Sequence, residues 1–158
     1  MIAIRPIEEG QGWAMLHLTK MMHGESPVYS PYPFEDDKLL GWVKLCIDSP
    51  DWLCLIAWEE GDRPPRRAQP IGFIAVGSVD MIFSNTRTVD DLGLFVVPKR
   101  RGSRCALRLV LEMESWAKDK GSVIRLGVTT GTNDESAERF LKRLGYVQSG
   151  VMLAKPII

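Results

Sequence analysis

A dense group of basic residues lies where a strand-like run passes into a helical one. The six residues after Pro98 read K-R-R-G-S-R and contain four cations, Lys99, Arg100, Arg101 and Arg104. A helix N-terminus presents unpaired N–H groups and the positive end of the helix dipole, which favour acidic side chains over basic ones. The segment therefore predicts a site for a phosphate or similar anion, with a solvated basic turn as the alternative. Neither the G-x-x-x-x-G-K-[ST] nor the G-x-G-x-x-G spacing is present.

Two adjacent carboxylates, Asp90 and Asp91, begin the strand-like run that leads into this basic segment. A carboxylate is a candidate general base. Because side chains alternate along a strand, the pair is expected on opposite faces, with Asp90 on the face of Leu92, Leu94 and Val96. A structural role for either carboxylate is the alternative.

A third group of candidates precedes the second predicted helix. His23 and Glu25 lie within residues 21–34, whose three prolines predict a loop. Histidine titrates near neutral pH, and a glutamate binds cations, although Glu25 is equally suited to capping local structure. Cys105, beside the basic residues, is either a reactive thiol or, as we favour, a buried residue on the apolar face of its helix.

The hydrophobic pattern predicts one α/β domain over residues 1–158, with a mixed sheet and the order β-α-α-β-β-β-α-β-α-β. Strands are expected at 2–7, 52–58, 70–83, 89–97, 122–130 and 146–154. Helices are expected at 8–22 with Gly24 as the stop, at 34–47, at 103–120, and from a cap at Thr132 or Asn133 to Gly145. A bulge or close backbone approach is expected near Gly72 and Gly77, and an exposed loop over 59–69.

Composition and charge argue against several classes of protein and of binding site. The 158 residues hold 20 basic and 20 acidic side chains, which argues against a globally basic nucleic-acid-binding protein. Residues 1–79 hold 7 basic and 11 acidic residues, whereas residues 80–158 hold 13 and 9. Three cysteines without C-x-x-C spacing predict neither a disulfide framework nor a metal site. With no secretory leader and no run of about 18 apolar residues, a cytoplasmic location is expected, in the host cytoplasm for a viral protein.

The basic segment and its surroundings resemble the acyl-CoA site of the GNAT superfamily of N-acetyltransferases over roughly residues 89–150. The family signature [Q/R]-x-x-G-x-[G/A] falls on residues 101–106, where Arg101 and Ala106 match and Arg104 replaces the central glycine. The resemblance implies that backbone N–H groups bind the pyrophosphate of acetyl-CoA, from Arg101, Gly102, Ser103, Arg104, Cys105 and Ala106. It also implies that Phe95, Val96 and Val97 pair with the pantetheine arm, and that Lys99 and Arg100 reach the 3′-phosphate.

A second segment resembles the family's N-x-x-A-x-x-x-Y-x-x-x-G-F pattern. With an allowance of one residue in the spacing, Asn133 and Ala137 match, and L-G-Y at 144–146 corresponds to the family's L-G-F ending. The family tyrosine, the general acid for the departing thiolate, is replaced by Leu141, which cannot donate a proton. The thiolate would then be protonated by water, by another side chain or by the product ammonium.

The resemblance predicts an N-acetyltransferase that moves an acetyl group from acetyl-CoA to a primary amine by direct attack in a ternary complex. Glu25, His23, Asp90 and Asp91 are the candidate catalytic residues, because the attacking amine must be neutral. The acceptor is a small molecule, a peptide or a protein, and the acidic first half is expected to receive it, including Glu25, Glu35, Asp36 and Asp37. The alternative is a non-catalytic CoA-binding or protein-interaction module. The H-x-E-S-P sequence suggests a bacterial or phage subset. Partners in a membrane or nucleic acid are not expected, and a homodimer is left open.

Overall fold

The computed structural model describes residues 1–61 and 67–157, which form a five-stranded sheet with helices on both faces. The strands are β1 (Ile2–Pro6), β2 (Trp52–Glu59), β3 (Gln69–Asp80), β4 (Arg87–Val96) and β5 (Val123–Arg125). The helices are α1 (Gly12–Glu25), α2 (Asp36–Asp48), α3 (Cys105–Ala117) and α4 (Asp134–Arg143), with a 3-10 turn, η1, at Pro98–Arg100. The mixed α/β class and the predicted order of elements as far as α4 are confirmed.

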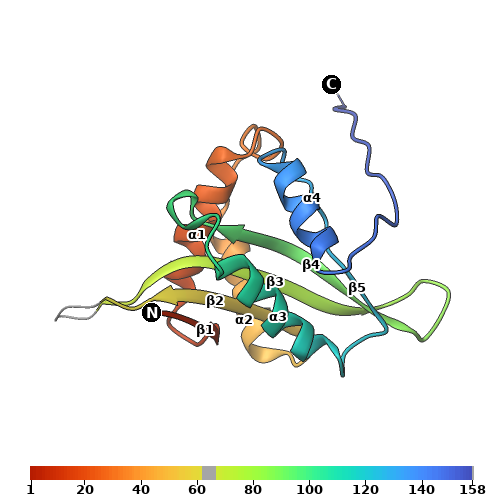
Figure 1. Ribbon diagram of the computed structural model, residues 1–158, viewed down its shortest axis with the longest axis horizontal. Coiled ribbons are helices and arrows are strands. Elements are labelled where there is room, and N and C mark those ends of the chain that lie inside the picture. The colour runs from red at the N-terminus through yellow and green to blue at the C-terminus, as the bar shows by residue number, and fades with distance from the viewer. Residues whose placement is uncertain (62–66, 158) are drawn as a thin grey trace.

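The strands lie in their order along the chain, β1-β2-β3-β4-β5. The pairs from β1 to β4 are antiparallel, and β4 pairs with β5 in parallel. In Figure 1, α3 lies in front of the sheet, and α1 and α2 lie behind it. The central strands are therefore buried on both faces, which explains why β2 is a continuous apolar run rather than an alternating one.

Each face of the sheet has its own hydrophobic core. Leu109, Val110 and Met113 of α3 are fully buried against one face. Leu18 of α1 and Val43 of α2 pack against the other. Beyond these two cores, β4 and β5 diverge, and the sheet is open between them.

Strand β4 contains one extra residue relative to its partner β3. Asp91 pairs with Val76 and Gly93 pairs with Ala75, so that Leu92 between them has no partner on β3. This is a β-bulge, which interrupts the alternation of side chains. Val76 belongs to the core under α3, and Ala75 belongs to the core under α1 and α2.

The bulge decides which carboxylate lies on which face. Leu94 and Val96 pack with the α3 core, and Asp91 shares their face because it lies opposite Val76. Asp90 points to the other face. The expectation that Asp90 shares a face with Leu94 and Val96 is therefore wrong, since strict alternation was counted through a residue that the bulge inserts.

Other predicted boundaries differ in instructive ways. Helix α1 continues through Gly24 to Glu25, so His23 and Glu25 are helical rather than part of a loop. A second bulge, at Ile71, lies next to Gly72, as expected, since Ala57 and Trp58 pair with residues 72 and 70. The loop predicted over 59–69 lies in part outside the described residues, because 62–66 are not among them.

The predicted strands after α3 are shorter than expected. β5 ends at Arg125 rather than at residue 130. Residues 146–157 form no strand, and Val147, Met152 and Leu153 are exposed. A three-residue β5 offers few backbone groups for a further strand to pair with, so the apolar pattern alone does not make one.

Candidate functional site

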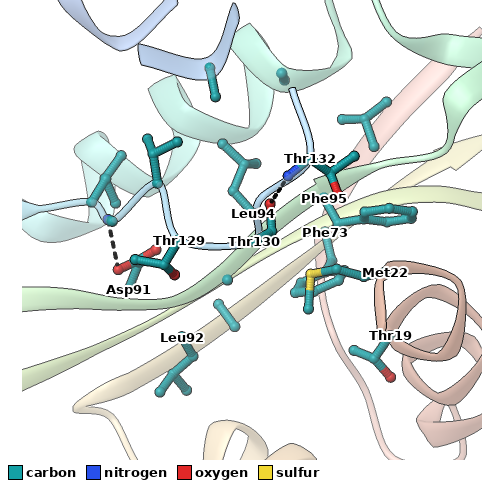
Figure 2. Close-up of a pocket in the computed structure, with 18 of the residues that line it drawn as sticks. Thr19, Met22, Phe73, Asp91, Leu92, Leu94, Phe95, Thr129, Thr130 and Thr132 are labelled. Carbon is teal, nitrogen blue, oxygen red and sulfur yellow. Dashed lines mark hydrogen bonds between the residues drawn. The ribbon is translucent and has the colours of Figure 1, made fainter. Parts of the chain in front are cut away.

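A cleft opens where β4 and β5 diverge. The two strands pair only from Thr88 to Asp90, opposite Val123 to Arg125. Beyond this point, β4 and the segment 126–132 form the two walls of a cleft with a volume of about 1180 Å³. Figure 2 shows Thr129, Thr130 and Thr132 on one wall, with Leu94 and Phe95 of β4 on the other. The cleft extends from the start of α3 to the space between α1 and α2.

One end of the cleft is formed by residues 98–107, which we call the basic loop. Gly102 has φ of +79°, a conformation that favours glycine. The N–H groups of Arg101 and Ser103 donate to Pro98 and Arg100 carbonyls, and that of Cys105 donates to the Ser103 hydroxyl. Within the described part of the chain, the N–H groups that have no partner alternate with these: Gly102, Arg104 and Ala106, followed by Leu107. Such a row at a helix N-terminus suits a phosphate.

The cations of the basic loop have different surroundings. Arg100 donates to Glu59 over 2.6 Å. Arg101 forms an ion pair with Glu25, donates to the Val96 carbonyl over 3.0 Å and lies over the Phe95 ring. The Arg101 side chain is thus directed to the end of α1, whereas Lys99 and Arg104 are exposed to solvent.

Cys105 offers the cleft neither its thiol nor its backbone N–H, which donates to the Ser103 hydroxyl. Its side chain is fully buried under α3, and burial raises the pKa of the thiol to about 11. The thiol is therefore protonated and inaccessible, which matches the structural alternative. The N–H group of Val97 is also engaged, because it donates to Ile71 of β3 over 2.9 Å, and Val97 does not line the cleft.

The paired aspartates have different surroundings. Asp91 lines the cleft near the point of divergence, and its Oδ1 accepts a hydrogen bond of 3.0 Å from the Gly127 N–H (Figure 2). Burial raises the pKa of Asp91, and the charge of Asp90 adds to this. Asp90 lies outside the cleft and accepts two hydrogen bonds from Arg125, which lower its pKa. The pairing of β4 with β5 thus ends in an ion pair, and the carboxylate beside it faces the cleft.

The candidates on α1 lie at the other wall. Glu25 lines the cleft, but its carboxylate is held by Arg101. His23 also lines the cleft, and its Nε2–H donates to the Tyr32 carbonyl over 2.8 Å, because a carbonyl only accepts. Its ring packs edge-on against Phe34.

The chain after α1 is joined to the wall opposite β4. The Ser26 hydroxyl is buried and donates to the Thr130 carbonyl. The Tyr29 hydroxyl lies 3.1 Å from the Thr129 hydroxyl, and a Cβ on Gly131 would lie 3.0 Å from Pro27. Residues 26–29 therefore link the end of α1 to the wall opposite β4, and Tyr29 lines the cleft there.

Helix α4 contributes both predicted and unpredicted residues. Asn133 and Ala137 line the cleft, and Asn133 is the residue before α4, with φ of 54°. Leu141 is 7% exposed and packs at the cleft wall, so it is a packing residue. Sequence reasoning missed four further lining residues, although their spacing on one helix face was a usable signal: Ser136, Arg139, Phe140 and Arg143.

The end of the cleft between α1 and α2 is apolar. We call this end the apolar pocket; its walls include Met15, Met22, Phe34, Leu39, Trp42 and Phe73. No sequence motif identified these residues, because they come from four separate elements or loops. The acidic side chains expected to receive an amine here, Glu35, Asp36 and Asp37, do not line the cleft.

The family of the protein follows from a comparison with family models. The model of the acetyltransferase (GNAT) family matches residues 12–146, which include the cleft walls and the basic loop. The chain belongs to this family. Members of the GNAT family are acyltransferases that use acetyl-CoA, so the predicted enzyme class and acyl donor are confirmed. A comparison with curated protein sequences gives no match.

Solved GNAT structures share the fold at low sequence identity. The aminoglycoside acetyltransferase AAC(6')-Iy, in complex with a bisubstrate analogue, superposes with a TM-score of 0.75 at 17% identity, covering 100% of this chain and 99% of that one. An aminoglycoside acetyltransferase from an uncultured soil metagenomic sample gives 0.72 at 16% identity, with the same coverage. A ribosomal-protein-alanine N-acetyltransferase from Brucella melitensis gives 0.70 at 12%, covering 99% and 100%. These likenesses show the fold, and their acceptors differ.

Across residues 1–61 and 67–157, no three His, Cys, Asp or Glu side chains gather as the ligands of a metal ion would. In the same ranges, no helix has the length and apolar character needed to cross a membrane.

Proposed function

We propose that this GNAT protein transfers the acetyl group of acetyl-CoA to a primary amine by direct attack in a ternary complex, with Asp91 as the general base. The observation that carries the proposal is a half-buried carboxylate that lines the cleft where the two strands diverge and whose pKa is raised by desolvation. A carboxylate with a raised pKa accepts a proton more readily once it is ionised, and so is better matched to general base catalysis near neutral pH.

The donor would be held mainly by backbone groups. The unpartnered N–H groups of Gly102, Arg104 and Ala106 suit the pyrophosphate, and exposed Lys99 suits a further phosphate. The edge of β4 beyond Asp90 lacks a strand partner on the β5 side in the described structure, which leaves backbone groups for the pantetheine arm. The residues present therefore fit the donor that the family uses.

The transfer needs one proton to be removed and one to be supplied. The amine nitrogen bonds to the thioester carbonyl carbon, the carbon–sulfur bond breaks, and Asp91 takes the proton from the nitrogen. The CoA thiolate then requires a proton. Leu141 has none to give, and of the three tyrosines only Tyr29 lines the cleft, so Tyr29, water and the product ammonium are the remaining donors.

The neighbouring aspartates provide a matched test. Asp91→Asn is expected to lower kcat/KM by about 10²- to 10³-fold, the size typical of losing a general base. Asp90→Asn alters the adjacent carboxylate in the same way but outside the cleft, and is expected to stay within about twofold of wild type. Release of free CoA from acetyl-CoA, with a panel of primary amines, measures both.

Calorimetry with acetyl-CoA completes the test. Both variants should bind acetyl-CoA as the wild type does, because neither carboxylate belongs to the basic loop. Equal losses of activity in the two variants, or full activity in Asp91→Asn, would contradict the role of Asp91. No saturable binding of acetyl-CoA by the wild type would contradict the proposed function as a whole.

A further inference from the structure

The apolar pocket has few groups that a highly charged ligand needs. Its walls are aromatic or aliphatic and include Phe34, Trp42, Met22 and Phe73. The Thr19 hydroxyl, one of its few polar groups, is satisfied by the Met15 carbonyl at 2.6 Å. A ligand in this pocket would exchange water for rings and methylene groups, which favours an apolar body.

The charges around the pocket also disfavour a ligand with several ammonium groups. Only two carboxylates line the cleft in the described structure, Glu25 and Asp91, and Arg101 already neutralises Glu25. Asp36, at the start of α2, lies outside the cleft and pairs with Lys20 over 2.8 Å. A ligand with several ammonium groups needs several carboxylates to replace its lost hydration, and the cleft offers one that is free.

We infer that the acetyl acceptor is a primary amine with one cationic nitrogen on an apolar, preferably aromatic, body. This inference rests on the proposed function and names the substrate class of the same cleft. The body would pack between Phe34, Leu39 and Trp42 on the α1 and α2 face of the sheet. The nitrogen would reach Asp91, on the α3 face, past the edge of β4 that β5 leaves open.

The pocket would also assist the chemistry. Apolar surroundings disfavour an ammonium ion relative to the neutral amine, so the acceptor would release its proton more easily there than in water. That first proton would leave to water, so that Asp91, as the one free carboxylate, stays ionised for the proton that the nitrogen loses on attack. A polycation would have to bring its remaining charges into the same apolar walls.

Direct binding tests the inference without relying on catalysis. Calorimetry without CoA compares 2-phenylethylamine and hexylamine with spermine, sisomicin and a short peptide bearing a free N-terminus. We expect saturable binding of 2-phenylethylamine at least about tenfold tighter than that of spermine or sisomicin, with hexylamine between them. Tighter binding of either polycation or of the peptide, or no binding of 2-phenylethylamine, would overturn the inference.

Two substitutions on α2 sharpen the result. Leu39→Glu places a carboxylate in the pocket and is expected to weaken 2-phenylethylamine about tenfold while improving spermine. Gly41→Glu adds the same charge to the same helix, where a side chain would meet open space, and should change neither. Equal effects of the two variants would mean that overall charge, rather than the pocket, sets the preference.

Trp42→Ala serves as a second variant if Leu39→Glu fails to fold. Trp42 is 39% exposed and packs at a tilt against Trp52, so its removal does not open the main core. It should weaken 2-phenylethylamine more than hexylamine, and an equal loss for both amines would contradict an aromatic preference. Because all of these measurements omit CoA, failure of the proposed transfer reaction is distinguished by the separate assay of CoA release.

Discussion

The two ends of the cleft differ in what they offer a ligand. The basic loop presents backbone N–H groups and cationic side chains, whereas the apolar pocket presents rings, thioethers and methyl groups. A polyphosphate and an apolar amine therefore have opposite preferences for the two ends, which keeps each from occupying the place of the other. The proposed reaction would take place between the two ends, where Asp91 lines the cleft.

The largest effect is expected in the pH dependence of kcat/KM, which tests Asp91, the carboxylate between the two ends of the cleft. As the proposed base, Asp91 can act only when ionised, so its contribution should be present above its pKa and lost as the pH falls through that value. Burial raises this pKa, so the loss begins at a higher pH than for an exposed aspartate. The ratio of wild-type to Asp91→Asn kcat/KM should fall about tenfold for each unit below it.

Taking this ratio removes the ionisation of the acceptor amine, which affects both enzymes equally. The measurement is CoA release at a series of pH values with one amine. A ratio that stays constant across the acid range would show that Asp91 is not the titrating base.

The next largest effect is expected on the affinity for acetyl-CoA, and it tests whether the basic loop and the apolar pocket bind their ligands independently. In Gly102→Val, a branched side chain must adopt a positive φ, which costs about 1–2 kcal/mol. The loop would relax, and the affinity for acetyl-CoA is expected to fall about 5- to 30-fold, measured by calorimetry. Binding of 2-phenylethylamine should be unchanged. Equal weakening of both ligands would show that the two ends are not independent.

Gly10→Val is the matched control for that substitution. Gly10 also has a positive φ, of 82°, and open space around its Cα, but it lies outside the cleft. The same strain should lower the melting temperature of this variant without changing its affinity for acetyl-CoA.

The smallest effect concerns the stability of the fold beside Asp91. Asp90→Asn removes the ion pair that ends the β4–β5 pairing and should cost no more than about 1 kcal/mol, because the pair is partly exposed. The pKa of Asp90 is lowered, so its stabilisation is present above the unfolded-state pKa and is lost as the pH falls through the folded-state value.

Asp91→Asn should have the opposite sign. It removes the cost of burying a charge, so its stability at neutral pH should equal or exceed that of wild type. Urea unfolding of the two variants at neutral pH compares them directly. A larger loss for Asp91→Asn would mean that Asp91 holds the fold together rather than serving the cleft.

The sequence predicted the parts of the site that lie close together along the chain. Residues 98–106 combine cations, a glycine and a helix start, so their pattern and their family resemblance indicated an anion site. The core strands followed from their apolar runs. The apolar pocket was not predicted, because Met22, Leu39 and Phe73 are brought together only by folding, and each is typical of an ordinary core residue.

The charge pattern of the first half was misleading for a related reason. Glu35, Asp36 and Asp37 are adjacent to the pocket in sequence, but they form the start of α2, where acidic side chains stabilise the helix dipole. The predicted last strand failed in the same way, since an apolar pattern specifies a strand only when a neighbour is there to pair with it.

The bulge at Leu92 shifts the alternation of side chains along β4 by one residue. Residues before it and after it obey different counts, so the number of residues from Pro98 back to a carboxylate does not by itself tell which way that carboxylate points. Removing Leu92 would restore strict alternation and leave Asp90 and Asp91 on their present faces, because Asp91 already lies opposite Val76 and Gly93 opposite Ala75. An alignment of this strand with a relative thus has to locate the bulge before it can assign a base.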